Sequence, residues 1–438
     1  MVSLGCSKNL IDGEVMLGIL KDNNYEIVSN KEDADIIIVN TCAFIETAQQ
    51  EAIETILEMA KLKEKSLKKL VVTGCLAQRY KDEIIKEIPE VDAVVGTSSV
   101  GDILVAIADE QKEDVFCKSF GNIDYLNHKR VVSTNKPTAY IKIAEGCDNF
   151  CTYCIIPKLR GKYTSRKIED IVKEAKDLAK EGYSEIVLVA QDVTVYGKDI
   201  YKEKAIVPLV RELSNIDGIK WIRLLYCYPE EITDDLIKEM KENEKLLSYL
   251  DVPIQHASDK VLKRMGRRGT SSFIRDILRK IRKEIPDVVL RTSLIVGFPG
   301  ETKEDFEILE DFVKEIEFDR LGVFKYSREE GTPAYKLKDQ IDEEIKEDRY
   351  NKIMTIQNGI SNKKNKKRLN KVYEAIVEGV SDDGIFYEGR TKEEAPDIDG
   401  KIYFTAMRDL NIGEYVLTKI INTDDYDLIG VVEDEFTE

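Results

Sequence analysis

Hydrophobic and polar positions divide the chain into three segments with different periodicities. In residues 1–127, short runs rich in Val and Ile, such as DIIIVN and KLVV, alternate with helical patterns such as EAIETILEMAKL. Alternating strand and helix patterns predict a parallel sheet with helices on its faces. We therefore expect a doubly wound α/β domain. Its opening strand, VSL, is short for a central parallel strand, which suggests a native start a few residues upstream.

Residues 138–365 contain six strand patterns separated by amphipathic helices. The strands are AYIKIAE, EIVLVA, WIRLLY, YLDVPIQ, VLRTSLIV and RLGVFKY. Six successive βα units predict a partial (βα)6 barrel rather than a closed eight-fold one. In such a barrel the functional face lies at the carboxyl ends of the strands.

Residues 371–438 change character again, because short strands follow one another without a long helix. YEAIVEGV, GIFYEGR, KIYFTA and EYVLTKIIN predict a small antiparallel β-barrel. The basic run SNKKNKKRLNK lies just before this segment. We interpret it as a solvated linker.

Composition describes a soluble protein, with 42% hydrophobic and 34% charged residues among 438. No apolar run reaches the roughly 18–20 residues of a membrane span, and no secretory signal is visible, so we expect a cytoplasmic protein. The net charge of −17 argues against general nucleic-acid binding. The last segment alone carries six basic and 18 acidic residues. This excess fits either a basic partner or a solvated acidic surface, and the sequence leaves both open.

Cysteines carry the strongest chemical signal. The motif EGCDNFCTYC places Cys147, Cys151 and Cys154 in a CxxxCxxC array after the first barrel strand. Three thiolates in one loop can hold a four-iron cluster while leaving one iron open to a small chelating molecule. A zinc site is the alternative, but it would lack its fourth ligand. With only two histidines in the chain, a His-rich metal site is nearly excluded.

A second set of cysteines follows the strands of the first segment. Cys6 comes after VSLG, Cys42 after DIIIVNT and Cys75 after KLVVTG. The carboxyl ends of parallel strands share one edge of the sheet, so these three thiols predict a second cluster site. Cys117 and Cys227 fit neither set, and we interpret both as small structural residues.

The first motif resembles the signature of the radical S-adenosylmethionine superfamily, with Tyr153 as the aromatic residue before the last cysteine. VGFPGET, which contains Gly297, resembles the superfamily's glycine segment near the cofactor. The resemblance implies that the open iron binds S-adenosylmethionine and that reductive cleavage yields a 5′-deoxyadenosyl radical.

The order of the three segments and the two cysteine sets resemble the methylthiotransferase family over nearly the whole chain. SLGCSKNLID, NTCAFIETA and VPIQHASDKVLKRMGR resemble its ribosomal-protein branch, called RimO. This resemblance implies a TRAM-like terminal domain, two 4Fe-4S clusters and transfer of a methylthio group to the β-carbon of an aspartate in ribosomal protein S-twelve. One S-adenosylmethionine would donate the methyl group and a second would supply the radical. An electron donor such as flavodoxin or ferredoxin is implied, the sulfur donor is unknown and RNA contact is not expected.

Other candidate residues lie at or near the ends of the predicted barrel strands. As cofactor contacts we expect Tyr153, Gln191, Arg223, Gln255, Arg291, Ser293 and Gly297. A structural hydrogen bond at the barrel rim explains most of them equally well. Arg291 is the strongest, because a charge inside an apolar strand needs a partner.

Charged residues outside the strands give candidates for substrate binding. Lys158 and Arg160 follow the first motif and could attract a carboxylate, although a solvated basic loop is the simpler interpretation. Glu393, Glu394, Asp397 and Asp399 surround Pro396 in a turn-rich stretch, where we expect them to be exposed and able to contact a basic substrate.

Two other functions stay open at this stage. One is methylthiolation of transfer-RNA adenosine, as in the MiaB branch. The other is a non-catalytic iron–sulfur electron carrier, which would leave the barrel unexplained.

Overall fold

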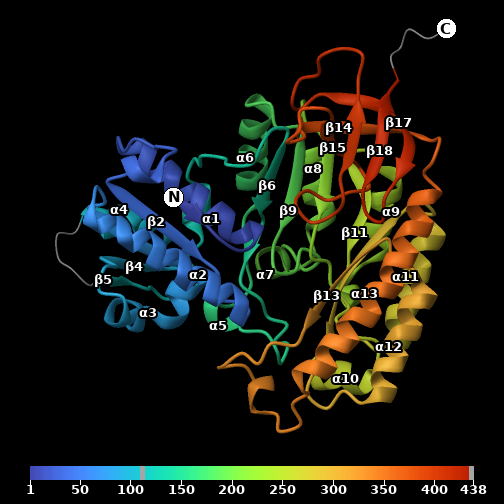
Figure 1. Ribbon diagram of the computed structural model, residues 1–438, viewed down its shortest axis with the longest axis horizontal. Helices are drawn as coiled ribbons and strands as arrows, with labels where there is room; N and C mark the ends of the chain where they lie inside the picture. The colour runs from blue at the N-terminus through green and yellow to red at the C-terminus, as the bar shows by residue number, and fades with distance from the viewer. Residues whose placement is uncertain (109–113, 434–438) are drawn as a thin grey trace.

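The computed structural model describes residues 1–108 and 114–433. The amino-terminal α/β unit lies beside an open barrel, and a small β-barrel covers one end of that barrel (Figure 1). Three long helices, α11 to α13, flank the side of the barrel that is far from the amino-terminal unit (Figure 1). The limits of the three expected domains stay a prediction.

The amino-terminal unit is a five-stranded parallel sheet whose strand order follows the chain. Its strands are β1 (Val2–Ser3), β2 (Ile36–Thr41), β3 (Lys69–Gly74), β4 (Ala93–Gly96) and β5 (Asp114–Phe116). Its helices are α1 (Ser7–Asp22), α2 (Glu46–Ala60), α3 (Cys75–Glu87) and α4 (Ile103–Ala108). Alternate strand residues pack against α1 and α4 on one face and α2 and α3 on the other, as expected for an α/β fold.

All six predicted barrel strands form, in the order β13-β12-β11-β10-β9-β6, and all of them are parallel. They are β6 (Thr138–Lys142), β9 (Glu185–Val189), β10 (Trp221–Leu224), β11 (Leu246–Asp251), β12 (Val289–Val296) and β13 (Arg320–Lys325). A two-stranded piece, β7 (Ala144–Glu145) with β8 (Thr164–Ser165), follows β6. The sheet is open between β6 and β13, so the prediction of a partial barrel is confirmed.

Among the helices of this segment, the longer ones bury their apolar faces against the sheet, whereas the short helix at 156–160 packs against the amino-terminal unit and the one at 198–201 has no buried residue. In chain order the helices are α5 (Ile156–Arg160), α6 (Ile168–Lys180), α7 (Lys198–Tyr201), α8 (Ile206–Ser214), α9 (Asp234–Glu242), α10 (Asp259–Arg264), α11 (Ser271–Glu284), α12 (Lys303–Ile316) and α13 (Glu343–Lys366). A capping box between Thr302 and Asp305 fixes the start of α12.

The basic run before the last segment presents mostly exposed lysines, as expected of a solvated face, but the expectation that it is a linker is wrong. Its first half is the end of α13, where Ser361 and Asn365 are buried, and Arg368 just beyond the helix is buried as well. The lysines and arginines of the run obscured a helix whose small polar residues face inward.

The last segment is a closed barrel of five strands. They are β14 (Val372–Val380), β15 (Tyr387–Thr391), β16 (Ile402–Thr405), β17 (Tyr415–Thr423) and β18 (Leu428–Val432). The sequence prediction missed β18, which is only five residues long. It pairs antiparallel with β17 but parallel with β16, so the barrel is not wholly antiparallel.

The small β-barrel covers the amino ends of the larger barrel's strands. Tyr140 in β6 donates a hydrogen bond to Asp397 at 3.0 Å, and Tyr249 in β11 donates one to Asp399 at 2.6 Å. Arg390 forms an ion pair with Glu185, the first residue of β9. One end of the large barrel is therefore closed. The amino-terminal unit contacts the other end, where Arg79 of α3 pairs with Glu329, which follows β13.

Candidate active site

The first cysteine motif forms a fixed loop at the carboxyl end of β6 and β7. Gly146 has a φ of 75°, and a Cβ there would lie 2.1 Å from the carbonyl oxygen of Lys162, so only glycine fits. The Cys147 amide donates to the carbonyl of Gly161 at 3.1 Å, and the Thr152 amide donates to that of Met265 at 2.8 Å. These contacts hold the loop before any ligand is bound.

The three thiols of this loop lie close enough to influence one another. Burial, with the neighbouring Cys151, raises the pKa of Cys147 to about 11. Burial, with both other cysteines, also raises the pKa of Cys154. Such thiols stay protonated without a cation, and a metal cluster is the usual means of holding them as thiolates. The donor set suits iron–sulfur chemistry.

The second set of cysteines meets at the carboxyl edge of the amino-terminal sheet. Cys42 follows β2 and Cys75 begins α3, one residue after the register pair Thr41 and Gly74. Gly5, with a φ of 92°, approaches so closely that a Cβ would lie 2.8 Å from the Cβ of Cys42. Cys6 is the next residue, so all three thiols share one site.

A positive charge from the barrel reaches this second site. Arg160 Nη2 lies 3.6 Å from Cys75 Sγ. Desolvation by the surrounding protein would raise the pKa of the Cys6 thiol, but Lys8 and Arg160 outweigh that effect and lower it. Burial still raises the pKa of Cys75 to about 11. Three thiols beside two cations again suit a cluster whose thiolate ligands carry negative charge.

Buried ion pairs connect the two cysteine sites. Arg160 contacts Asp12 of α1 at 3.0 Å and Glu145 at 2.8 Å. Lys142 pairs with the same two carboxylates. Glu145 in turn accepts the amide of Gly146 at 3.1 Å, next to Cys147. A continuous set of contacts therefore runs from Cys75 to the first motif, across the interface between the amino-terminal unit and the barrel.

Comparison with known proteins gives the family. Sequence profiles match the uncharacterized protein family UPF0004 over residues 1–96, the radical SAM superfamily over 141–313 and the TRAM domain over 371–432. The chain is 61% identical over 444 residues to ribosomal protein uS12 methylthiotransferase RimO of Acetivibrio thermocellus, covering 99% of this chain and 98% of that one. It is 53% identical over 438 residues to the RimO of Clostridium novyi (strain NT), with the same coverage.

The chain belongs to the RimO family of radical S-adenosylmethionine methylthiotransferases. Its cofactor classes are accordingly iron–sulfur clusters and S-adenosylmethionine. The fold is also similar to that of a radical S-adenosylmethionine methyltransferase, TsrM, from Kitasatospora setae. The TM-score is 0.56 at 14% identity, and the match covers 75% of this chain and 74% of that one.

Several cofactor contacts expected from the sequence lie at the open end of the barrel. Tyr153 packs beside Phe298 and is next to Cys151. The Gln255 amide donates to the carbonyl of Ser293 at 2.9 Å, and Gly297 adopts a φ of 72°. Their roles toward the cofactor stay predictions.

Gln191 lies beside them. Its Nε2 donates to Glu145 at 3.3 Å, and its buried Oε1 has no hydrogen-bond partner among the described residues. A buried polar atom without a partner is costly, and this one fits a ligand at the mouth of the barrel.

Arg223 and Arg291 belong to a different place from the one expected. Arg223 pairs with Glu185 at 3.1 Å and donates to the carbonyl of Lys392. Arg291 pairs with Asp251 at 2.9 Å and lies 3.7 Å from Asp399. Arg223 links the barrel interior to the β domain at the closed end, whereas Arg291 lies between Asp399 on that side and Asp251, the last residue of β11. These structural partners already balance the charge of each arginine. The lack of a partner, which had suggested cofactor binding, is therefore not present.

The basic loop after the first motif is also corrected. Lys158 is exposed, as a solvated loop requires, but Arg160 is buried between Asp12 and Glu145. The sequence analysis overlooked Lys8, Asp12 and Glu145. The only available signal was that Lys8 and Glu145 stand two positions from a cysteine and that Asp12 lies on the helix that follows Cys6.

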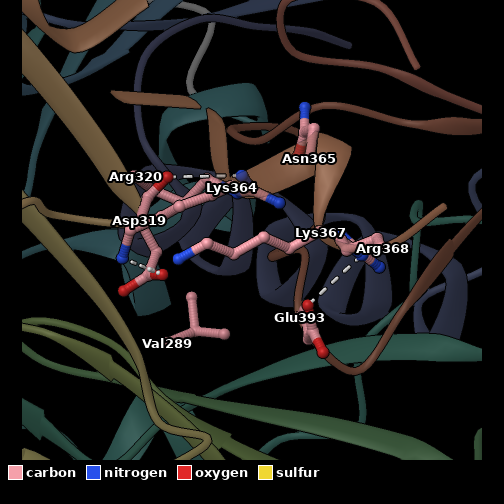
Figure 2. Close-up of a pocket in the computed structure, with 8 residues that line it drawn as sticks. All are labelled: Val289, Asp319, Arg320, Lys364, Asn365, Lys367, Arg368 and Glu393. Carbon is pink, nitrogen blue, oxygen red and sulfur yellow. Dashed lines mark hydrogen bonds and ion pairs between the residues drawn. The ribbon is translucent and has the colours of Figure 1, made fainter. Parts of the chain in front are cut away.

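The acidic stretch around Pro396 is largely buried, so the expectation of four exposed carboxylates is wrong. Glu394 pairs with Arg320 at 2.7 Å and Arg368, and Asp399 accepts from Tyr249. Glu393 is half-buried at a cavity of about 210 Å³ (Figure 2). Only Asp397 is exposed, and it too accepts a hydrogen bond from the barrel.

Figure 2 shows the lining of this cavity, where Asp319 and Arg320 face the last turn of α13 and Glu393. The ion pairs of Glu394 with Arg320 and Arg368 join the two barrels. These contacts occupy the Glu394 carboxylate, so it is not available to bind a substrate.

Two further features are missing from residues 1–108 and 114–433. No described helix has the length and apolar character needed to cross a membrane. Within the same ranges, no three Cys, His, Asp or Glu side chains converge on the position of a single metal ion.

Proposed function

We propose that this chain adds a methylthio group to the β-carbon of an aspartate in ribosomal protein uS12. The support is the set of buried ion pairs that joins the two three-cysteine sites, together with full-length identity to RimO proteins. A single cluster site would serve radical generation alone. A second set of three thiols next to it provides a site that can hold the sulfur to be transferred.

In this proposal the two sets of cysteines hold different clusters. Cys147, Cys151 and Cys154 hold the cluster that binds S-adenosylmethionine, and Cys6, Cys42 and Cys75 hold the auxiliary cluster. The bound cofactors supply a hydrogen-abstracting radical and a methylated sulfur. We assign these tasks to residues 138–365 and 1–127, respectively, and assign closure of the barrel to residues 371–438.

The residues around the clusters orient and insulate them. Glu145 holds the Gly146 amide, which fixes the start of the cysteine loop. Arg160 sets positive charge against the auxiliary thiols and ties their domain to the barrel. The β domain closes the opposite end, which excludes water and quenching solutes from the barrel interior.

The partners follow from this chemistry. One-electron cleavage needs a low-potential donor, for which we propose a flavodoxin or ferredoxin. The uS12 protein is reached in the cytoplasm, where ribosomes assemble. The sulfur donor is not assigned.

The mass of uS12 in cells with and without this gene tests the proposal. The expected result is a uS12 heavier by one methylthio group, replacing one hydrogen, only when the gene is present. Unmodified uS12 in both strains would overturn it. Gene-dependent methylthiolation of transfer-RNA adenosine instead would favour the MiaB-type activity.

A further inference from the structure

Lys8 is a buried cation between the two cysteine sites. It lies in the first turn of α1, two residues after Cys6, with 6% of its surface exposed. Its Nζ stands 3.1 Å from the ring centroid of Tyr226. Tyr226 follows β10 at the carboxyl end of the barrel, so Lys8 reaches from the auxiliary site to the rim of the radical site.

The other buried cations of this interface each have a carboxylate partner. Lys142 has Glu145, and Arg160 has Asp12. Farther along the same interface, Arg130 pairs with Glu174 at 2.8 Å. Lys8 differs, because among residues 1–108 and 114–433 its Nζ contacts the Tyr226 ring but has no hydrogen bond or ion pair.

The acidic groups near Tyr226 already have other partners. Asp251 binds Arg291 at 2.9 Å and the Tyr226 amide at 3.0 Å. Asp192 accepts from Asn149 at 3.1 Å and from Thr194. Lys8 lowers the pKa of the neighbouring Cys6 thiol, but no carboxylate of the described residues pairs with its ammonium, whose nitrogen is not among the fully buried atoms. The ammonium can therefore also receive an anion that comes from outside the chain.

We propose that Lys8 binds the side-chain carboxylate of the substrate aspartate. The inference rests on the proposed function, because that reaction requires the β-carbon to lie between the radical site and the sulfur site. The carboxylate is bonded directly to the β-carbon. An ammonium held over the Tyr226 ring, between the two domains, therefore fixes the position of the β-carbon that reacts. It also distinguishes aspartate from asparagine.

Binding of two peptides tests this assignment. One peptide carries the uS12 sequence around the modified aspartate, and the other has asparagine at that position. Fluorescence anisotropy with anaerobically reconstituted protein measures both dissociation constants. Wild type should bind the aspartate peptide about tenfold more tightly, as expected for loss of one charge-assisted contact. Lys8→Met should bind both peptides equally, at the affinity of wild type for the asparagine peptide.

Two further variants serve as controls. Lys21→Met removes an exposed lysine from the last turn of the same helix and should keep the full preference for aspartate. Lys8→Arg keeps the charge and should restore part of the preference. Iron content, measured for each protein, reports whether the auxiliary site is intact.

The outcomes are distinguishable. A Lys8→Met protein that keeps both its iron and its tenfold preference overturns the inference. Loss of iron with the preference unchanged also overturns it, because Lys8 would then be only a counter-ion of the auxiliary cluster. Equal binding of the two peptides by the wild type overturns the inference but not the proposed function, which the mass of uS12 in cells tests separately.

Discussion

The two ends of the large barrel are both rich in buried charge, but they use it differently. At the amino end every buried carboxylate described above has a basic or hydroxyl partner, as Glu185 has in Arg223 and Arg390. At the carboxyl end, Lys8 has no carboxylate and Gln191 Oε1 has no donor among the described residues. Paired charges join domains at both ends, whereas the unpaired ammonium and the amide oxygen without a donor at the carboxyl end fit a ligand. A charged residue in a barrel strand is therefore no guide to cofactor binding until its partner is known.

The largest effect on activity is expected from substitutions at the open, carboxyl end of the barrel. Replacing Cys147, Cys151 and Cys154 by Ala should reduce formation of 5′-deoxyadenosine to the level without enzyme. Iron should fall from about eight to about four per chain, because the auxiliary site keeps its own ligands. Anaerobic reconstitution followed by iron analysis and chromatography measures both. A triple variant that loses all its iron, or a wild type that binds only four, would contradict two separate sites.

A smaller effect is expected at the closed end. Burial would raise the pKa of Glu185, but Arg390 and Arg223 lower it to about 2. Glu185→Gln leaves those arginines without their counter-charge, and it should lower the free energy of unfolding by about 3 kcal/mol near pH 7. Because the folded-state pKa is depressed, this difference should shrink as the pH falls from about 5 toward 2. Denaturant unfolding at several pH values measures it.

The surface pair Lys220 and Glu374 provides the control for that experiment. These side chains are 41% and 39% exposed and their charged atoms lie 2.6 Å apart. Glu374→Gln should cost less than about 1 kcal/mol, since water screens the pair. Equal effects of the two substitutions would show that burial does not distinguish the closed end from an ordinary surface.

The smallest expected effect concerns the acidic surface of the β domain. Asp382 and Asp409 are exposed, unlike Glu394 and Asp399, so their reversal leaves the contact between the barrels intact. Asp382→Lys with Asp409→Lys should slow association with basic uS12 a few-fold at low salt, and the difference should vanish at high salt. Stopped-flow association rates check it. Rates independent of both salt and charge would make this a solvated surface only.

Sequence patterns predicted the features that depend on periodicity and local spacing. The six barrel strands, the parallel amino-terminal sheet and the closeness of Cys6, Cys42 and Cys75 follow from strands that end at one edge. Partners far apart in the sequence were not predictable. Arg160 looked like a loop residue because Asp12 lies 148 positions away. Glu394 looked exposed because Arg320 and Arg368 lie on other elements.

The same limit explains the strand and the helix that the sequence prediction missed. β18 is held in the barrel by β16 and β17, and its five residues carry little pattern of their own. The end of α13 reads as a polar linker because Gln357, Ser361 and Asn365 are the residues that face inward there. Hydrophobic periodicity does not detect a buried face made of small polar side chains.

The most direct measurement separates the two cysteine sites within one reaction. A variant with Cys6, Cys42 and Cys75 replaced by Ala is incubated with dithionite, S-adenosylmethionine and uS12, and both products are quantified. It should still form 5′-deoxyadenosine, because Cys147, Cys151 and Cys154 stand on another domain, but it should attach no methylthio group to uS12. Methylthiolated uS12 from this variant would contradict the assignment of sulfur transfer to the second site. Loss of 5′-deoxyadenosine while the first cluster stays spectroscopically intact would contradict the division of tasks between the two sites.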